Sequence, residues 1–276
     1  RGRVRACGAL KEYSPSLAEV ASLAVARGAH GGGLGRRVVA ELEALARMRG
    51  IDELFALTLT AGFFESVGYV VTERSRYPEN DAVNARWYPA SAEKQAGKSK
   101  QAIVVMPQWN ADAFSHNALC TLFNRFGISA LRLSKPYHDI RRPAELERSD
   151  YAVSANIGRT LEACRQAVVD IRSCLDWLEE QGYEQFGVLG TSLGSCYAFI
   201  AAAFDARLRV CAFNHASTWF GDVVWKGQST RHIRAAFEDA GLTQDQVREI
   251  FAIVSPMSYM QRFAANPKRA LVVHAT

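Results

Sequence analysis

The stretch QFGVLGTSLGSCYAFIAAAF, residues 185–204, decides the fold of most of this chain. Its first residues predict a short buried strand, and its second half is almost entirely apolar, which predicts a buried helix. Between them lies the pattern Gly-x-Ser-x-Gly, formed by Gly190, Ser192 and Gly194. A strand, a sharp turn and a helix are the setting in which this pattern exposes a reactive serine. The alternative is a glycine-rich turn with an incidental serine, because the five-residue pattern alone is common.

Strands and helices alternate on both sides of this stretch. Further buried strands are predicted at residues 102–107, 128–134, 208–216 and 269–275. Helices are predicted at 112–127 and 156–182, and Thr243 with Gln246 has the signature of a capping box at the start of another helix. Continuous apolar strands that alternate with helices predict a parallel sheet covered on both faces.

The first part of the chain has its own pattern. Strands are predicted at residues 3–13, 17–26, 53–60 and 70–77, and helices at 36–50 and 61–68. A strand at 83–89 and a polar loop at 90–101 follow. The sequence therefore predicts an α/β protein with two domains, residues 1–77 and residues 78–276.

Composition excludes several classes of function. The net charge of +5 at pH 7 is spread evenly, which is too dilute for a nucleic-acid-binding surface. No apolar run approaches the length of a transmembrane segment. The six cysteines form no Cys-x-x-Cys pair and no zinc-like spacing, so no metal site is predicted. Reduced, buried cysteines are the simplest interpretation, and they favour the cytoplasm. The sequence does not indicate an oligomeric state.

Residues 80–276, with the serine turn at their centre, resemble the α/β-hydrolase family. The resemblance implies that Ser192 is a nucleophile that attacks an acyl carbon. It also implies that backbone N–H groups hold the oxyanion, one from Leu193 and one from the loop after residues 102–107, where Gln108 and Trp109 are the candidates. The helical, aromatic segment at about 216–262 corresponds to the place where this family inserts a cap.

The family order of the catalytic triad is serine, acid, histidine. The strand at 269–275 is the natural one to precede the acid, so we expect both the acid and the histidine to lie beyond Thr276 and the 276 residues alone to be inactive. His138, Asp139 and His215 follow predicted strands on the side of the sheet where sites gather, and each could contact substrate. Hydrogen-bonded structural roles are the alternative for these three residues. His116 and His232 lie on predicted helices and are expected to face solvent or to pack.

A second glycine cluster, HGGGLG at residues 30–35, lies between a predicted strand and a predicted helix. Backbone N–H groups at such a turn can bind an anion. The spacing fits neither the dinucleotide-binding fingerprint nor a P-loop. This turn and the run GFFESVGY at 62–69 resemble the GNAT-type acetyltransferases, in particular those of the N-acetylglutamate synthase type.

That resemblance implies that acetyl-CoA binds through His30, Gly31, Gly32, Gly33, Leu34 and Gly35. His30 replaces the usual arginine or glutamine, and Phe64 replaces a tyrosine that often acts as the general acid. The family's first strands and helices would precede Arg1, so CoA binding rather than a complete acetyltransferase is expected. A glycine-rich turn without a ligand is the alternative.

Taken together, the sequence predicts a serine hydrolase that acts on an ester, thioester or amide of a small-molecule acyl substrate and needs no cofactor for that reaction. Acetyl-CoA is the cofactor expected for the first domain. One alternative is that amino-acid N-acetylation is the defining activity. Another is a non-catalytic binding or scaffold protein that keeps both folds.

Overall fold

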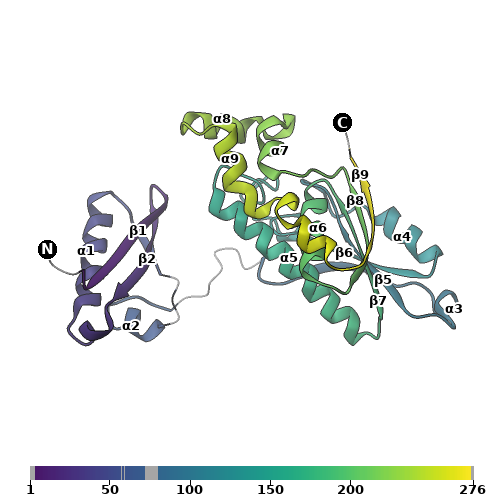
Figure 1. Cartoon of the computed structure of the whole chain (residues 1–276), viewed down its shortest axis with the longest axis horizontal. Coiled ribbons are helices and arrows are strands. Elements are labelled where there is room, and N and C mark those ends of the chain that lie inside the picture. Colours follow the sequence, from purple (N-terminus) through teal and green to yellow (C-terminus); the bar gives the residue numbers. More distant parts are fainter. Residues whose placement is uncertain (1–3, 57, 59, 72–79, 275–276) are drawn as a thin grey trace. The chain divides into compact units, whose positions relative to one another are not determined.

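The computed structural model describes residues 4–56, 58, 60–71 and 80–274. The chain divides into two compact units, Arg1–Arg76 and Tyr77–Thr276 (Figure 1). Each unit is described by itself.

The first unit is a small sheet with one long helix. Strand β1 (Ala6–Ser14) pairs antiparallel with β2 (Leu17–Val25), and β2 pairs parallel with β3 (Glu53–Phe55). Helix α1 (Leu34–Met48) packs on this sheet, since its Val39 and Leu42 share a buried cluster with Val20 and Phe64. A single turn of 3₁₀ helix, η1 (Arg27–Ala29), and the short helix α2 (Ala61–Glu65) complete the unit.

Three predictions for this unit need correction or lie outside the description. The strand predicted at 53–60 ends at Phe55, and the helix predicted at 61–68 ends at Glu65. The strand predicted at 70–77 lies mostly outside the described residues, because its residues 72–77 are among those not described.

The second unit is built on a six-stranded sheet with the order β4-β6-β5-β7-β8-β9. These strands are β4 (Asn84–Tyr88), β5 (Gln101–Met106), β6 (Ile128–Ser134), β7 (Gln185–Thr191), β8 (Leu208–Asn214) and β9 (Arg269–Val273). Only β4 runs antiparallel to its neighbour, and the other pairs are parallel. The carboxyl ends of the five parallel strands therefore meet at one edge of the sheet, where sites gather in α/β folds.

Helices cover both faces of this sheet, as the apolar strands predicted. Ala102, Val104 and Met106 of β5 face the core that includes α5 (Ile157–Glu180) and α6 (Leu193–Phe204). Ile103 and Val105 face the other way, into a cluster with Cys120 of α4 (Asn117–Arg125). This alternation follows from the pleat of a strand, in which successive side chains point to opposite faces.

The segment between β8 and β9 is helical. It contains α7 (Phe220–Lys226), η4 (Gln228–Thr230), α8 (Arg231–Asp239), α9 (Gln244–Ile250), η5 (Phe251–Val254), η6 (Pro256–Tyr259) and α10 (Met260–Ala264). The capping box predicted at Thr243 and Gln246 is present at the start of α9. Within the part of the chain that is described, no helix has both the length and the apolar character needed to cross a bilayer.

Two local predictions differ from the structure. The helix predicted from residue 112 begins only at Asn117, because the carboxylate of Asp112 accepts the backbone N–H groups of Phe114 (3.0 Å) and Ser115 (2.7 Å) and closes a turn. Such side-chain turns compete with helix. The loop predicted at 90–101 contains the short helix α3 (Ala92–Gln95).

A buried ion pair joins the loop after β6 to α5. Arg141 and Asp170 are both fully buried, and their side chains approach to 2.5 Å. The Arg141 guanidinium also donates to the carbonyl oxygens of Ser134 (2.8 Å) and Asn80 (2.7 Å). Removing one partner of such a pair leaves an uncompensated charge in the core, which costs far more than losing an exposed pair.

We predict that Asp170→Ala destabilises the second unit by about 3–5 kcal/mol, because it leaves the buried Arg141 charge without its partner. Urea-induced unfolding followed by near-UV circular dichroism measures the loss. The matched control is Glu162→Ala, which removes the partner of Arg165 from a pair whose side chains are 52% and 51% exposed. That change should cost no more than about 1 kcal/mol. Equal losses in the two variants would contradict a structural role for the buried pair.

Candidate active site

Ser192 occupies a strained turn between β7 and α6. Its backbone has φ 52° and ψ −117°, a conformation that residues with a side chain rarely adopt. The Ser192 N–H donates to the carbonyl of Asn214 at the end of β8 (2.9 Å). Its carbonyl accepts from the N–H (2.8 Å) and the hydroxyl (2.6 Å) of Ser195. These bonds hold the turn in place, while the Ser192 side chain stays partly exposed.

The two glycines of the motif provide space rather than unusual backbone angles. A Cβ atom on Gly194 would lie 2.2 Å from the carbonyl oxygen of Met106 and 2.5 Å from that of Pro107. A Cβ on Gly190 would lie 2.3 Å from the carbonyl oxygen of Gly194. The first turn of α6 therefore rests directly on the end of β5. This close approach is what a nucleophile elbow requires.

The same contact brings the three predicted oxyanion donors into one region. Leu193 is the first residue of α6, and Gln108 and Trp109 follow Pro107 at the end of β5. The backbone N–H groups of these three residues donate to no acceptor among the described residues. The Trp109 indole is anchored separately, since its Nε1 donates to the carbonyl of Ser149 (3.0 Å).

The Ser192 hydroxyl has no hydrogen-bonded histidine in the described part of the chain. His116 lies nearby, with its Nε2 at 2.9 Å from the hydroxyl of Thr191, the residue before Ser192. Burial, together with the positive charges of Arg132 and Lys135, lowers the pKa of His116. Sequence reasoning missed this contact. The sequence offered one signal for this contact, namely that His116 lies in the segment that follows β5.

His215 lies beside the elbow. It follows β8 directly, has φ 55° and is exposed. Its neighbour Asn214 accepts the N–H of Ser192, so the two residues that follow β7 and β8 are adjacent at the same edge of the sheet. The prediction that His215 contacts substrate stays open to test.

His138 and Asp139 have a different environment from the one expected. His138 is 0% exposed, its Nδ1 lies 2.8 Å from the carbonyl of Pro136, and its Nε2 has no partner among the described residues. Burial, reinforced by Lys135, keeps the pKa of His138 well below its usual value. The Asp139 side chain is 2% exposed and pairs with Arg132 at 2.5 Å. Because both side chains are enclosed, we assign them to the framework of the site and not to substrate contact.

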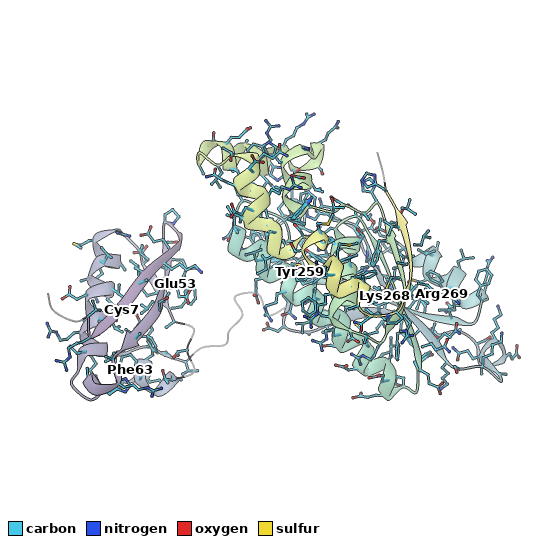
Figure 2. The ribbon with its side chains drawn as sticks, viewed as in Figure 1. Cys7, Glu53, Phe63, Tyr259, Lys268 and Arg269 are labelled. Carbon is cyan, nitrogen blue, oxygen red and sulfur yellow. The ribbon has the colours of Figure 1, made fainter. Side chains whose placement is uncertain are left out.

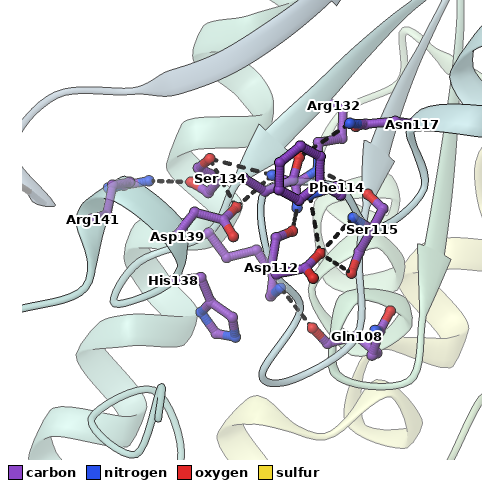
Figure 3. A network of polar contacts seen from close by, with 12 residues as sticks. Gln108, Asp112, Phe114, Ser115, Asn117, Arg132, Ser134, His138, Asp139 and Arg141 are labelled. Atoms are coloured by element: carbon purple, nitrogen blue, oxygen red, sulfur yellow. Dashed lines mark hydrogen bonds and ion pairs between the residues drawn. The ribbon is translucent and has the colours of Figure 1, made fainter. Parts of the chain in front are cut away.

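Figure 3 shows the polar network that includes Asp139, with His138 close to it. Arg132 of β6 holds Asp139 on one side and donates to the carbonyls of Asp112 and Ser115 on the other. Lys135, just after β6, donates to the carbonyl of Gln108 (2.9 Å). The network therefore ties the loop after β5 to the end of β6. None of the described residues forms a cluster of His, Cys, Asp or Glu that could hold a metal ion.

The aromatic residues of the helical segment have partners within it. The Arg248 guanidinium lies 4.5 Å from the centre of the Trp219 ring, and that of Arg234 lies 5.2 Å from the Trp225 ring. Ordinary packing accounts for these rings.

The glycine turn of the first unit leads into α1. Gly31 has φ 77° and Gly33, the residue before the helix, has φ 74°. A Cβ atom at either position would meet no atom within 4 Å, so the space beside the turn is open. The first N–H groups of a helix lack intrahelical partners and can bind an anion. The turn therefore offers open space and backbone N–H groups at which an anion could bind.

Gly35, His30 and Phe64 also make contacts within the first unit. A Cβ on Gly35 would lie 3.2 Å from the Phe63 ring, so Gly35 lets α1 approach α2 (Figure 2 labels Phe63). The His30 Nε2 lies 2.9 Å from the carbonyl of Val25. Phe64 is buried, and its ring packs edge-on against those of Phe63 and Tyr69. Phe64 is therefore part of the core of the first unit, which suits its apolar side chain.

Comparison with known proteins finds two family models that match separate parts of the chain. Residues 1–69 match the model of the acetyltransferase (GNAT) family. An uncharacterised N-acetyltransferase of Chlorobaculum tepidum is 39% identical over 79 residues, which are 29% of this chain and 51% of that protein. The chain thus spans about half the length of this curated relative.

Residues 116–226, which include Ser192, match the model of alpha/beta hydrolase domain containing 18. An acetyl xylan esterase from Paenibacillus sp. R4 has a similar structure, with a TM-score of 0.50 and 14% identity over 70% of this chain and 73% of that one. The acylaminoacyl peptidase of Pyrococcus horikoshii gives a TM-score of 0.50 and 14% identity over 79% of this chain and 34% of that one. At this identity the likeness concerns the fold alone. The chain thus consists of a GNAT acetyltransferase segment followed by an α/β-hydrolase domain.

Proposed function

We propose that the second unit is a serine hydrolase that acts on an ester, thioester or amide of a small-molecule acyl substrate, with Ser192 as its nucleophile. One observation carries the proposal. Ser192 is held at φ 52° between two glycines that admit no side chain, and the turn rests on the end of β5. Strained backbone of this kind clusters at functional sites.

In the proposed reaction, the Ser192 hydroxyl attacks the acyl carbon and its proton passes to a base. The N–H groups of Leu193 and of Gln108 or Trp109 hold the oxyanion that forms. The alcohol, thiol or amine then leaves, and water releases the acid from the acyl-enzyme. A scaffold protein that had lost its chemistry would keep the fold without a reactive serine.

We predict that a fluorophosphonate probe labels Ser192 slowly but selectively even without a base, because the N–H groups of Leu193 and of Gln108 or Trp109 would stabilise the negative charge that develops on the probe's oxygen, a stabilisation that an ordinary surface serine lacks. Mass spectrometry of the labelled peptide locates the adduct. Ser192→Ala should abolish labelling, whereas Ser217→Ala should not, since Ser217 lies in the nearby loop and contacts only the Trp219 carbonyl. Folded protein that resists the probe after prolonged exposure would favour the scaffold alternative.

The base is the missing component, since the Ser192 hydroxyl contacts no histidine in the described residues. We therefore propose that the 276 residues alone turn over esters slowly. Loss of triad partners costs roughly 10⁴–10⁶ in kcat.

Hydrolysis of p-nitrophenyl acetate tests this prediction. The chain should hydrolyse the ester at a rate close to that of the Ser192→Ala variant, and His116→Ala and His215→Ala should leave that rate unchanged. Fast turnover that one of these histidine variants abolishes would instead identify that residue as the base.

A second activity is proposed for the first unit, namely binding of acetyl-CoA at residues 30–35. The open turn at Gly31 and Gly33, together with the first turn of α1, supports it. Acetyl-CoA would supply an acetyl group as a thioester. Transfer of that group to an amino acid is the alternative defining activity of the protein.

The cysteines bear on the location of the protein. Five of them are buried free thiols, which is consistent with a reducing compartment, so the cytoplasm stays the proposed location; Cys7 is exposed.

We predict that acetyl-CoA at about 1 mM, the upper end of common KM values, raises the thermal unfolding temperature of the first unit. Differential scanning calorimetry measures the shift. Gly33→Asp should remove it, because a carboxylate in the turn repels pyrophosphate. Gly50→Asp is the matched control, since Gly50 also has positive φ (70°) and open space but lies just beyond the other end of α1. The claim fails if the wild-type protein shows no shift.

A further inference from the structure

Lys135 is a buried lysine whose position in the fold is unusual. It follows β6, is 1% exposed and donates through Nζ to the carbonyl oxygen of Gln108 at 2.9 Å. The same carbonyl accepts the N–H of Ala111 at 3.2 Å. Gln108 lies in the loop that carries one of the proposed oxyanion donors. Lys135 therefore contacts the backbone of the loop that carries this donor.

Because of the geometry of the peptide group, this contact also orients the N–H group of Trp109. The carbonyl of Gln108 and the N–H of Trp109 belong to one planar trans peptide, in which the two groups point in opposite directions. Fixing the carbonyl toward Lys135 fixes the Trp109 N–H away from it. That N–H donates to no acceptor among the described residues. A hydrogen bond at the carbonyl also polarises the N–H of the same peptide and strengthens it as a donor.

The rest of the loop is held in the same way. Arg132, three residues earlier on β6, donates to the carbonyls of Ser115 (3.1 Å) and Asp112. Figure 3 shows these bonds from β6 to the loop. Two cations, Arg132 on β6 and Lys135 just after it, thus fix the course of the chain between β5 and α4.

The burial of Lys135 carries a desolvation cost that a purely structural contact would not require. Burial lowers its pKa to about 7; Asp139 opposes the shift and Arg132 adds to it. His138 and His116 also face Lys135, and its charge lowers the pKa of each of them. Asp112 is the acidic residue of the loop itself. An apolar side chain of the same length would avoid this desolvation cost.

We propose that Lys135 is a positioning residue of the active site: its ammonium group holds the Gln108–Trp109 peptide so that the Trp109 N–H is presented as the second oxyanion donor beside Leu193. The oxyanion role rests on the function proposed above. The coupling between Lys135 and the Trp109 peptide does not.

The charge on Lys135 gives this coupling a pH dependence. The ammonium form, which makes the stronger bond to the Gln108 carbonyl, prevails below the pKa of about 7 and is lost as the pH rises through it. Stability has the opposite sign. The unfolded chain keeps the proton up to about pH 10.5, so the folded state gains stability as the pH rises from about 7 toward 10.5.

The experiment compares the full chain with Lys135→Met and with Lys268→Met. Lys268 is the matched control, because it also donates to a backbone carbonyl, that of Ala202 on α6, but lies before β9 (labelled in Figure 2). The first measurement is the ¹⁵N–¹H resonance of Trp109 as a function of pH. We expect a titration with a midpoint near 7 in the wild type and in Lys268→Met, and none in Lys135→Met.

The second measurement is the rate at which the fluorophosphonate probe labels Ser192 below pH 7. Removing one oxyanion donor outright typically costs about 10²–10³ in rate, so a donor that is merely misplaced should cost roughly tenfold or more in Lys135→Met. Lys268→Met should label at the wild-type rate. The rise in stability of the wild type above pH 7, relative to Lys135→Met, is a third readout that checks the pKa itself.

The outcomes separate the two proposals. A Trp109 resonance that titrates alike in Lys135→Met and in the wild type overturns the positioning role, whatever the labelling rate of Ser192. A wild-type protein that shows the titration but is never labelled overturns the hydrolase function while keeping the coupling. If Lys135→Met does not fold, the ¹³Cε resonance of Lys135 in the wild type replaces it. Its midpoint must then coincide with that of Trp109, and a different midpoint overturns the proposal.

Discussion

The second unit depends on one close contact, between the first turn of α6 and the end of β5. Gly194 has no side chain, and any Cβ there would overlap the carbonyls of Met106 and Pro107. This contact allows Ser192 to project from a strained turn. It also sets Leu193 against the loop that begins at Gln108. The proposed nucleophile, Ser192, and the N–H groups proposed to hold its oxyanion are therefore positioned by the same approach of two backbones.

The features that could be predicted from the sequence are those encoded within a few residues. Apolar strands, glycine turns and the capping box at Thr243 each have a local signal, and the parallel sheet with helices on both faces follows from their order. The sharp turn at Ser192 could be predicted because Gly190 and Gly194 flank it at fixed spacing. Gly8 had no such signal, although a Cβ there would lie 2.7 Å from Val38 of α1, because close packing of a helix on a strand depends on distant residues.

The polar framework of the site could not be predicted in this way. Arg132 and Lys135 look like the polar positions of an ordinary strand, and nothing nearby in the sequence says that they reach the loop after β5. His138 and Asp139 were placed at the correct edge of the sheet, but their burial depends on how that loop folds over them. The late start of α4 has a local cause instead, since the Asp112 carboxylate accepts the N–H groups of Phe114 and Ser115 in place of a helical turn. The other features of this framework result from tertiary contacts.

The outer strand of the larger sheet has a consequence for handling the protein. In the described residues β9 pairs with β8 alone, and its Leu271, Val272 and Val273 are 62%, 59% and 46% exposed. An apolar edge strand with unpaired backbone groups is a template for adding further strands. Addition of a further strand along β9 would cover these exposed apolar side chains. A charged residue placed on that strand would make the protein easier to study at the concentrations that spectroscopy needs.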